Sequence, residues 1–292
     1  MKHLLKMMDL STEEIIEILN LADQLKYELK HGIPHDHLKG KTLGMIFRKA
    51  STRTRVSFET GMYQLGGNPL YLSASDMQIG RGEPIQDTAR VLSRYIDGIM
   101  IRTFDQAEVE NLAEYGNIPI INGLTDLSHP CQVLADLMTI REYKGKLDGL
   151  KMCYIGDGNN MANSLIVGGL KTGMSVSVAC PENYHPAATT LAFAEKYDCF
   201  ELTDDPIKAA KDADVIYTDV WVSMGEPDEV WEKRIKELSP YKVTKEVMAN
   251  AKDTAIFLHC LPAFHDLKTK IGAEMGQRFG IEDMEVTDEV FE

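Results

Sequence analysis

Paired or clustered cysteines are absent from this sequence. Its five cysteines are widely spaced and include no C-x-x-C pair; they are Cys131, Cys153, Cys180, Cys199 and Cys260. An odd number of dispersed cysteines does not fit a disulfide framework, and the spacing does not fit a zinc site. We therefore expect reduced thiols in an intracellular protein.

Long hydrophobic runs and an excess of positive charge are also absent. The apolar run in Met1–Asp9 is too short for a secretory signal, and no stretch approaches the roughly 18 apolar residues of a membrane span. Thirty-one Lys and Arg against 45 Asp and Glu give a formal net charge of -14, which is unsuited to a phosphate-backbone partner. The sequence predicts a cytoplasmic protein with neither nucleic acid nor a membrane as its partner.

What is present is an ordinary globular composition. The chain has 292 residues, of which 44% are hydrophobic and 26% are charged. This length and composition suffice for two compact domains, each with its own hydrophobic core.

Helical and strand patterns alternate along the chain. Ser11–Glu14 has the form of a capping box and begins a long amphipathic helix that ends before Gly32–Pro34. Short apolar runs then alternate with helical patterns, which is typical of a parallel sheet with crossover helices. The expected strands of the first half are Thr42–Phe47, Pro69–Leu72, Gly98–Ile101 and Ile118–Ile121, and the expected helices are Val56–Leu65, Ile85–Tyr95 and Ala107–Tyr115.

The same alternation restarts after an expected helix at Cys131–Tyr143. Its strands are expected at Lys151–Ile155, Ser175–Ala179, Val215–Thr218 and Ala255–His259. We therefore predict an α/β protein of two similar domains, each a parallel sheet flanked by helices. Because a polar, glycine-bearing break follows the Cys131–Tyr143 helix, we place the boundary at its start, giving domains 1–130 and 131–292.

A cation-rich turn follows the first expected strand and precedes a helix. Arg48–Arg55 holds four cations and three hydroxyls without one acid. Free backbone N–H groups and the positive end of the helix dipole favour an anion at such a turn, most plausibly a phosphate. The alternative is a solvated basic turn in an acidic protein.

Two more groups are expected beside this turn. Arg102 directly follows the strand Gly98–Ile101, and His129–Gln132 opens a helix after the fourth strand. In open α/β sheets, ligands bind at the carboxyl ends of the strands. Guanidinium and imidazole donors there would suit a carbonyl oxygen that gains charge during attack, although a lone histidine is more often structural.

Polar residues also follow the strands of the second half. Gly156–Asn160 partly resembles a dinucleotide fingerprint, but it lacks the third glycine, and its asparagines can serve a polar ligand instead. Asp219 follows one later strand, and Cys260 follows another. Taken singly, Asp219 could be a helix cap and Cys260 a buried apolar residue; their joint position favours a site.

Four motifs together resemble the aspartate/ornithine carbamoyltransferase family over nearly the whole chain. They are Ser51–Arg55, His129–Gln132, Asp219-x-Trp221-x-Ser223-Met224-Gly225 and His259–Pro262, of which the last two resemble the ornithine branch. The resemblance implies that the carbamoyl group of carbamoyl phosphate is transferred to the δ-amine of L-ornithine, giving L-citrulline and phosphate in arginine metabolism. It implies carbamoyl phosphate on domain 1–130, ornithine on domain 131–292, no metal or organic cofactor, and a homotrimer with shared active sites.

The resemblance also implies a role for each motif residue. Ser51, Thr52, Arg53 and Thr54 would hold the phosphate with Gln78 of a neighbouring subunit, and Arg102, His129 and Gln132 would contact the carbamoyl part. Asn160 and the Met224 backbone would hold the ornithine carboxylate, Asp219 and Ser223 its α-amine, and Cys260 with Leu261 would lie beside the δ-amine. Arg53, Arg102, His129 and Cys260 are the expected catalytic residues.

The sequence departs from the family pattern at its C-terminus. The chain ends at Glu292, where the family usually continues into a final helix that bears an arginine, and we expect this helix to be lacking. Other interpretations are a carbamoyltransferase for putrescine or aspartate, a nicotinamide-dependent oxidoreductase that uses Gly156–Asn160, and a regulatory protein that binds without turnover.

Overall fold

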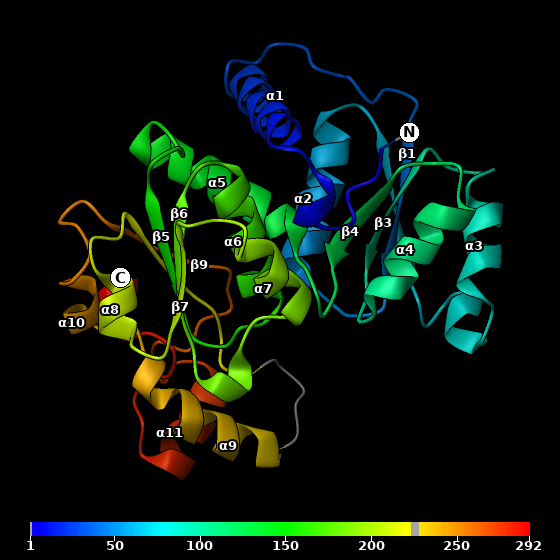
Figure 1. The fold of residues 1–292 in the computed structure, drawn as a ribbon. Helices are drawn as coiled ribbons and strands as arrows, with labels where there is room; N and C mark the ends of the chain where they lie inside the picture. Colours follow the sequence, from blue (N-terminus) through cyan, green and yellow to red (C-terminus); the bar gives the residue numbers. More distant parts are fainter. Residues whose placement is uncertain (1, 223–227) are drawn as a thin grey trace. The chain divides into compact units, whose positions relative to one another are not determined.

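The computed structural model describes residues 2–222 and 228–292 (Figure 1). The chain divides into two compact units, Met1–Met138 and Thr139–Glu292. The division falls inside α5 (Pro130–Lys144), whereas the sequence analysis placed the boundary at the start of this helix. No glycine interrupts the helix between Pro130 and Lys144, so no break in the chain marks the division.

The first unit contains a four-stranded parallel sheet in the order β2-β1-β3-β4. All four strands overlap the predicted ones. Strand β4 starts two residues later than predicted, because its pairing with β3 begins at Ile120 and not at Ile118. The strands are β1 (Thr42–Phe47), β2 (Asn68–Ser73), β3 (Gly98–Arg102) and β4 (Ile120–Leu124).

Helices cover both faces of this sheet (Figure 1). Helix α2 (Thr52–Gln64) lies on one face, and α3 (Ile85–Leu92) and α4 (Gln106–Tyr115) lie on the other. Neighbouring residues of β1 therefore belong to opposite clusters: Met45 packs with Met62 of α2, and Ile46 packs with the residues of α3 and α4. Because both faces of the sheet are covered, the residues of β1 form a continuous apolar run in the sequence.

The first long helix forms as the capping-box pattern predicts. In α1 (Thr12–Lys30), the Ser11 hydroxyl accepts from the Glu14 N–H and the Glu14 carboxylate accepts from the Ser11 N–H. Gly32 follows the helix with a φ of +64°, a conformation that glycine adopts at little cost. The short 3-10 helix η1 (Met7–Asp9) precedes it.

The second unit contains a five-stranded parallel sheet in the order β7-β6-β5-β8-β9. Four strands match the predictions, and the fifth, β7, was not predicted. Strand β7 is a short edge strand whose residues alternate and are only half-buried, so it lacks the apolar run of an inner strand. The strands are β5 (Lys151–Ile155), β6 (Ser175–Ala179), β7 (Phe200–Thr203), β8 (Val215–Thr218) and β9 (Ile256–His259).

The helices of the second unit form two face layers and one separate cluster (Figure 1). Helices α6 (Asn160–Lys171) and α7 (Ala188–Ala194) cover one face, and α8 (Pro206–Ala210), α10 (Lys245–Met248) and α12 (Asp288–Phe291) cover the other. Helices α9 (Asp228–Leu238) and α11 (Lys270–Phe279) pack together in a cluster around Trp231 and Phe264. The remaining 3-10 helices are η2 (Gln78–Arg81), η3 (Glu182–Tyr184) and η4 (Ser239–Tyr241).

Each sheet reverses its strand order at one point. In the first sheet, the chain goes from β1 to β2 on one side and returns to place β3 on the other. In the second, it goes from β5 through β6 to β7 and returns to place β8 beside β5. Loops that leave the two strands at such a point turn to opposite faces, and the crevice between them is the usual ligand site. The switch points are therefore β1/β3 and β5/β8.

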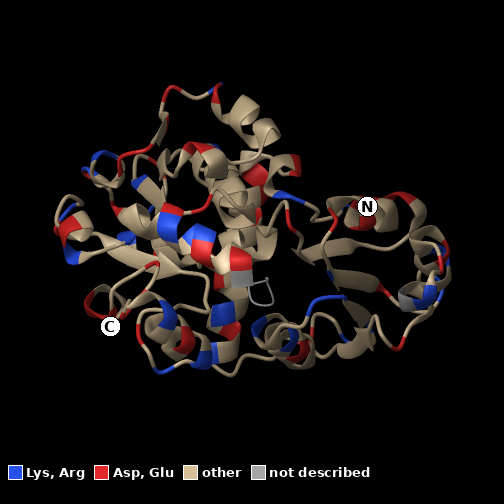
Figure 2. Cartoon of the chain, turned by 90° about the horizontal axis from the view of Figure 1, so that it is seen from below, with Lys and Arg blue, Asp and Glu red and all other residues tan. Residues whose placement is uncertain are grey.

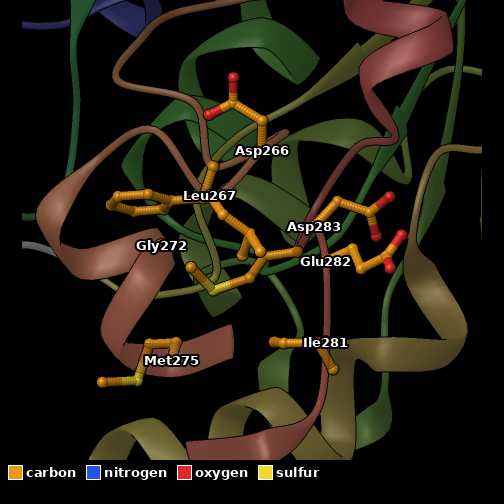
Figure 3. A pocket seen from close by; sticks show the side chains of 9 residues that line it. Asp266, Leu267, Gly272, Met275, Ile281, Glu282 and Asp283 are labelled. Atoms are coloured by element: carbon orange, nitrogen blue, oxygen red, sulfur yellow. The ribbon is translucent and has the colours of Figure 1, made fainter. Parts of the chain in front are cut away.

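Two hollows lie away from these switch points. An apolar groove of about 610 Å³ in the first unit is lined by residues at the amino ends of the strands, including Thr42, Gly98 and Pro119. A shallow depression lies beside α11; Figure 3 shows Leu267, Met275 and Ile281 around it, with acidic side chains at its side. Neither hollow includes a predicted site residue. Among the helices of the described residues, none has the length and apolarity to cross a membrane.

The close approach of two chain segments at Gly158 gives a stability prediction. A Cβ at Gly158 would lie 2.3 Å from the Tyr184 carbonyl oxygen and 2.4 Å from Pro186 N, whereas a Cβ at Gly61 in α2 would meet nothing. Gly158→Ala is expected to destabilise the protein by about 1–3 kcal/mol, and Gly61→Ala to stabilise it by about 0.5–1 kcal/mol. Thermal unfolding of both variants checks this; a Gly158→Ala midpoint equal to that of the parent would contradict the close approach.

Candidate active site

The cation-rich turn forms the N-terminus of α2 at the end of β1. Ser51 is the N-cap, and its Oγ accepts from the Thr54 N–H at 3.2 Å and lies 3.0 Å from Thr54 Oγ1. The helix has thirteen residues and no acid in its first turn. Its free N–H groups, dipole and hydroxyls therefore lie together, as the sequence predicts for an anion site.

The four cations of this turn are in different environments. Arg48 pairs with Glu108 of α4, and Arg55 pairs with Glu59 at 2.9 Å while its guanidinium lies over the Tyr71 ring. Within residues 2–222 and 228–292, no carboxylate pairs with Arg53, which is exposed. Lys49 Nζ lies 5.4 Å from the centre of the Phe104 ring. Among the described residues, Lys49 and Arg53 are thus the cations of the turn without a carboxylate partner, and Arg53 is the more exposed of the two.

Arg102 reaches this turn from the neighbouring strand. It ends β3, and its Nη1 donates to Thr54 Oγ1 at 3.3 Å. Its carbonyl oxygen accepts from the Arg48 N–H at 2.9 Å, which fixes the end of β3 against the start of the turn. The structure thus brings Arg102 to Ser51–Thr54 at the switch point β1/β3, as expected from the sequence.

His129 lies at the start of α5 and remains neutral. Its pKa is lowered from 6.5 to about 3, mainly by burial and to a smaller extent by the nearby Arg102 charge. A neutral imidazole can donate one hydrogen bond without adding a charge. The loop that carries it is held by buried side chains that the sequence analysis missed: Thr125 Oγ1 donates to Gln106 Oε1 at 2.7 Å and accepts from the Ser128 N–H at 3.1 Å.

The two predicted glutamines differ in their surroundings. Gln132 Nε2 donates to Asp136 Oδ1 at 3.0 Å, one turn further along α5. Gln78 is exposed at the first residue of η2. Its predicted contact is with a neighbouring subunit and stays a prediction.

The environment of His129 gives a prediction about its charge. We expect its ring resonances to show no protonation between pH 8 and pH 5, because burial keeps the pKa near 3. Arg102→Met should raise this pKa only in part, since burial is the larger cause. Imidazole NMR spectra over this range check both statements, and a midpoint near 6.5 in the parent protein would contradict the buried, neutral ring.

Asp219 is the centre of the second unit's polar cluster. It follows β8, is 7% exposed, and accepts three hydrogen bonds: Asn159 Nδ2 at 2.8 Å, Val220 N–H at 2.7 Å and Cys260 Sγ at 2.9 Å. A buried carboxylate needs such donors, and they fix the direction in which it can receive a cation. Asp219 thus links the loops after β5, β8 and β9.

The two neighbouring asparagines have separate tasks. Asn159 is the N-cap of α6, where its Oδ1 accepts from the Met161 N–H at 2.9 Å while its Nδ2 binds Asp219. Asn160 is the first helical residue. From the sequence, both asparagines are candidates for a polar ligand, and the family resemblance assigns Asn160 to the carboxylate. The sequence does not predict that Asn159 caps α6 and binds Asp219, because which of two adjacent asparagines caps a helix depends on the local backbone path.

Cys260 donates to a carboxylate in the second unit. Its Sγ donates to Asp219 Oδ1 at 2.9 Å. The sulfur therefore carries a proton that it can pass to Asp219 Oδ1. A thiolate next to this anion would be disfavoured.

A buried pair holds the turn that follows Cys260. Leu261 has a φ of +57°, which is rare for a leucine, and its N–H donates to His259 Nδ1 at 2.9 Å. His259 Nε2 consequently carries the ring proton and donates to Glu285 Oε1 at 3.2 Å, which also accepts from the Phe264 N–H. The sequence marks His259 only as the first residue of the His259–Pro262 motif, and it gives no signal for Glu285. Together the two residues fix the Leu261 conformation, although they lie 26 positions apart in the chain.

The predicted residues Ser223 and Met224 lie outside the described residues. Figure 2 shows Lys and Arg interspersed with Asp and Glu over the helices of both units rather than gathered in one patch. The cation-rich N-terminus of α2 is thus a local feature of an acidic protein.

Known protein families match both units. The model of the aspartate/ornithine carbamoyltransferase carbamoyl-P binding domain matches residues 2–142, and the model of the Asp/Orn binding domain matches residues 148–292. The matched pair defines a class of two-domain α/β transferases. The chain belongs to the aspartate/ornithine carbamoyltransferase family.

Individual relatives are similar over most of their length. The ornithine carbamoyltransferase of Thermococcus kodakarensis is 55% identical over 90% of this chain and 84% of its own length. The catabolic ornithine carbamoyltransferase of Treponema denticola is 51% identical over 99% of this chain and 87% of its own. The solved structure of the Pyrococcus furiosus ornithine carbamoyltransferase has a TM-score of 0.90 and 51% identity, covering 100% of this chain and 89% of that one.

Proposed function

We propose that this chain transfers the carbamoyl group of carbamoyl phosphate to the δ-amine of L-ornithine, forming L-citrulline and phosphate. The observation that carries the proposal is the buried Asp219 carboxylate with its Asn159 and Cys260 donors, in a chain more than half identical to several ornithine carbamoyltransferases. The reaction belongs to arginine metabolism, where such a transferase makes or breaks citrulline.

The first unit binds carbamoyl phosphate. Its phosphate dianion lies at the N-terminus of α2, where the Ser51, Thr52 and Thr54 hydroxyls and backbone N–H groups donate and Arg53 supplies charge. Arg102, which already contacts Thr54, lies between the phosphate and the carbonyl. Its charge polarises the carbonyl and stabilises the oxyanion that forms on attack.

His129 and Gln132 orient the carbamoyl group. A neutral His129 donates one hydrogen bond to the carbonyl oxygen without placing a second positive charge beside Arg102. Gln132, whose Nε2 donates to Asp136, offers its amide oxygen to the carbamoyl NH2. The planar carbamoyl group is thus held in one orientation, which gives the amine a defined direction of attack.

The second unit binds ornithine. Asp219 receives the α-ammonium with Ser223, and Asn160 with the Met224 backbone holds the carboxylate. The three donors already on Asp219 leave its cation-binding direction fixed. The δ-amine extends to Cys260 and the backbone of Leu261, at the end of β9.

The δ-amine must lose a proton before it attacks. A lysine-like amine has a pKa near 10.4, so only about one molecule in several thousand is neutral at pH 7. Cys260 Sγ takes this proton as its own proton passes to Asp219 Oδ1, 2.9 Å away. The neutral nitrogen then bonds to the carbonyl carbon, and the carbon–oxygen bond to phosphate breaks. Phosphate leaves with the pair of electrons and takes the second proton, which the nitrogen loses as the citrulline N–H forms.

The protein acts as a cytoplasmic homotrimer with shared active sites. Gln78, exposed at the start of η2, reaches the phosphate bound by the next subunit. The family membership and the exposure of Gln78 support this arrangement. The dispersed cysteines are consistent with a reducing compartment.

The nicotinamide alternative is disfavoured by the loop after β5. A pyrophosphate would approach the glycines of this loop, but the space beside the Gly158 Cα is occupied by the backbone of residues 184–186. The asparagine that follows binds Asp219 instead.

Citrulline formation tests the proposal. The purified protein should form citrulline from carbamoyl phosphate and L-ornithine, with putrescine and L-aspartate carbamoylated at least a hundredfold more slowly. Turnover of putrescine or aspartate at the ornithine rate would assign the protein to another member of the class, and binding without turnover would make it regulatory.

Arg53 is expected to carry phosphate binding. Arg53→Ala should lower carbamoyl phosphate affinity at least tenfold, because a charge-assisted contact contributes about 1.5–3 kcal/mol. Arg55→Ala, which removes a cation already paired with Glu59, is the matched control and should change the affinity less than threefold. Calorimetric titration measures both; equal losses in the two variants would contradict a specific role for Arg53.

The shared site gives a prediction for mixed subunits. Arg53→Ala and Gln78→Ala chains should each be inactive, because each lacks one phosphate contact. After subunit exchange at equal amounts, about one quarter of the sites combine an intact Arg53 with an intact Gln78, so about that fraction of activity should return. Each variant incubated alone is the control, and no recovery after confirmed exchange would show that the sites are self-contained.

A further inference from the structure

Arg234 of α9 makes a set of contacts that the proposed chemistry does not use. Its Nη1 donates to Asp157 Oδ2 at 2.5 Å and to the Trp221 carbonyl oxygen at 2.8 Å. Its guanidinium lies 5.1 Å from the centre of the Tyr184 ring, whose hydroxyl donates to Glu237 of the same helix at 2.6 Å. One side chain thus contacts three separate segments of the second unit.

Two of these segments are the loops of the switch point β5/β8. Asp157 lies two residues before Asn159, and Trp221 lies two residues after Asp219. Asn159 and Asp219 are hydrogen-bonded to each other at 2.8 Å. Arg234 is therefore a second link between the same two loops, in addition to the Asn159–Asp219 bond.

The contact between Arg234 and Asp157 joins two partly buried charges, and leaving either one unpaired would cost free energy. The Asp157 side chain is 12% exposed and that of Arg234 is 30% exposed, so their pairing is shielded from water. Burial raises the pKa of Asp157 and the Asp219 charge adds to this rise, whereas the Arg234 charge opposes it. Without the guanidinium, the Asp157 loop would move toward water or take up a proton.

We propose that Arg234 is a positioning residue for the amino-acid substrate, because it clamps the Asp157 and Trp221 loops and so fixes Asn159 and Asp219. This role rests on the proposed function for its substrate, and it involves no contact between Arg234 and ornithine. This role requires arginine, because one planar guanidinium contacts a carboxylate, a carbonyl oxygen and an aromatic ring at the same time. Lysine keeps the charge but lacks the planar group.

The test uses variants of the full chain with a matched control. Arg234→Gln removes the clamp, Arg234→Lys keeps its charge, and Asp157→Asn removes its main acceptor charge. Lys233→Gln removes the same charge from the neighbouring exposed position of α9 and is the control. Should Arg234→Gln fail to fold, the milder Arg234→Lys and Asp157→Asn variants carry the test.

Steady-state kinetics should separate the two substrates. In Arg234→Gln, the KM for ornithine should rise at least tenfold and the KM for carbamoyl phosphate less than twofold. Arg234→Lys should lie between Arg234→Gln and the parent, and Lys233→Gln should match the parent. The double variant Arg234→Gln/Asp157→Asn should be little worse than Arg234→Gln alone, because both changes break the same link.

Amide hydrogen exchange gives a readout that does not need turnover. The amides of residues 157–160 and 219–222 should exchange at least tenfold faster in Arg234→Gln than in the parent or Lys233→Gln. Equal rises in both KM values, or unchanged exchange in these loops, would overturn the proposal. If the parent makes no citrulline, the proposed function fails, and the exchange result alone then decides whether Arg234 clamps the loops.

Discussion

Parallel strands place all their carboxyl ends along one edge of a sheet, and the two candidate sites depend on this constraint. The first sheet brings the turn after β1 and Arg102 at the end of β3 into contact at Thr54. The second sheet brings the loops after β5, β8 and β9 together at Asp219. The loops after β1 and β3 flank the point where the strand order of the first sheet reverses. The loops after β5 and β8 do the same in the second sheet.

The two sites have opposite electrostatic character, which suits two different substrates. The N-terminus of α2 combines hydroxyls, a helix dipole and the unpaired charge of Arg53, so it attracts an anion. Asp219 is a buried carboxylate whose donors are an amide, a backbone N–H and a thiol, none of which neutralises its charge. Its charge suits an ammonium group, and we propose that its thiol neighbour supplies a path for a proton.

The sequence predicts the elements that have a local signal. Inner strands such as β1 and β5 are continuous apolar runs, and the Ser51 turn is marked by its cap and its cations. The short edge strand β7, the assignment of the capping task to Asn159, and the His259–Glu285 pair were missed. Each depends on tertiary contacts: the edge of a sheet, the path of one turn, and two residues 26 positions apart in the chain.

We propose that phosphate binds to the first unit and ornithine to the second. A crystal structure of the protein with phosphate and L-ornithine, a pair that cannot react to citrulline, tests it most directly. We expect phosphate at the Ser51–Thr54 turn with Arg53, and the ornithine α-ammonium within hydrogen-bond distance of Asp219. An ornithine bound at the N-terminus of α2, or one bound away from Asp219, would contradict it.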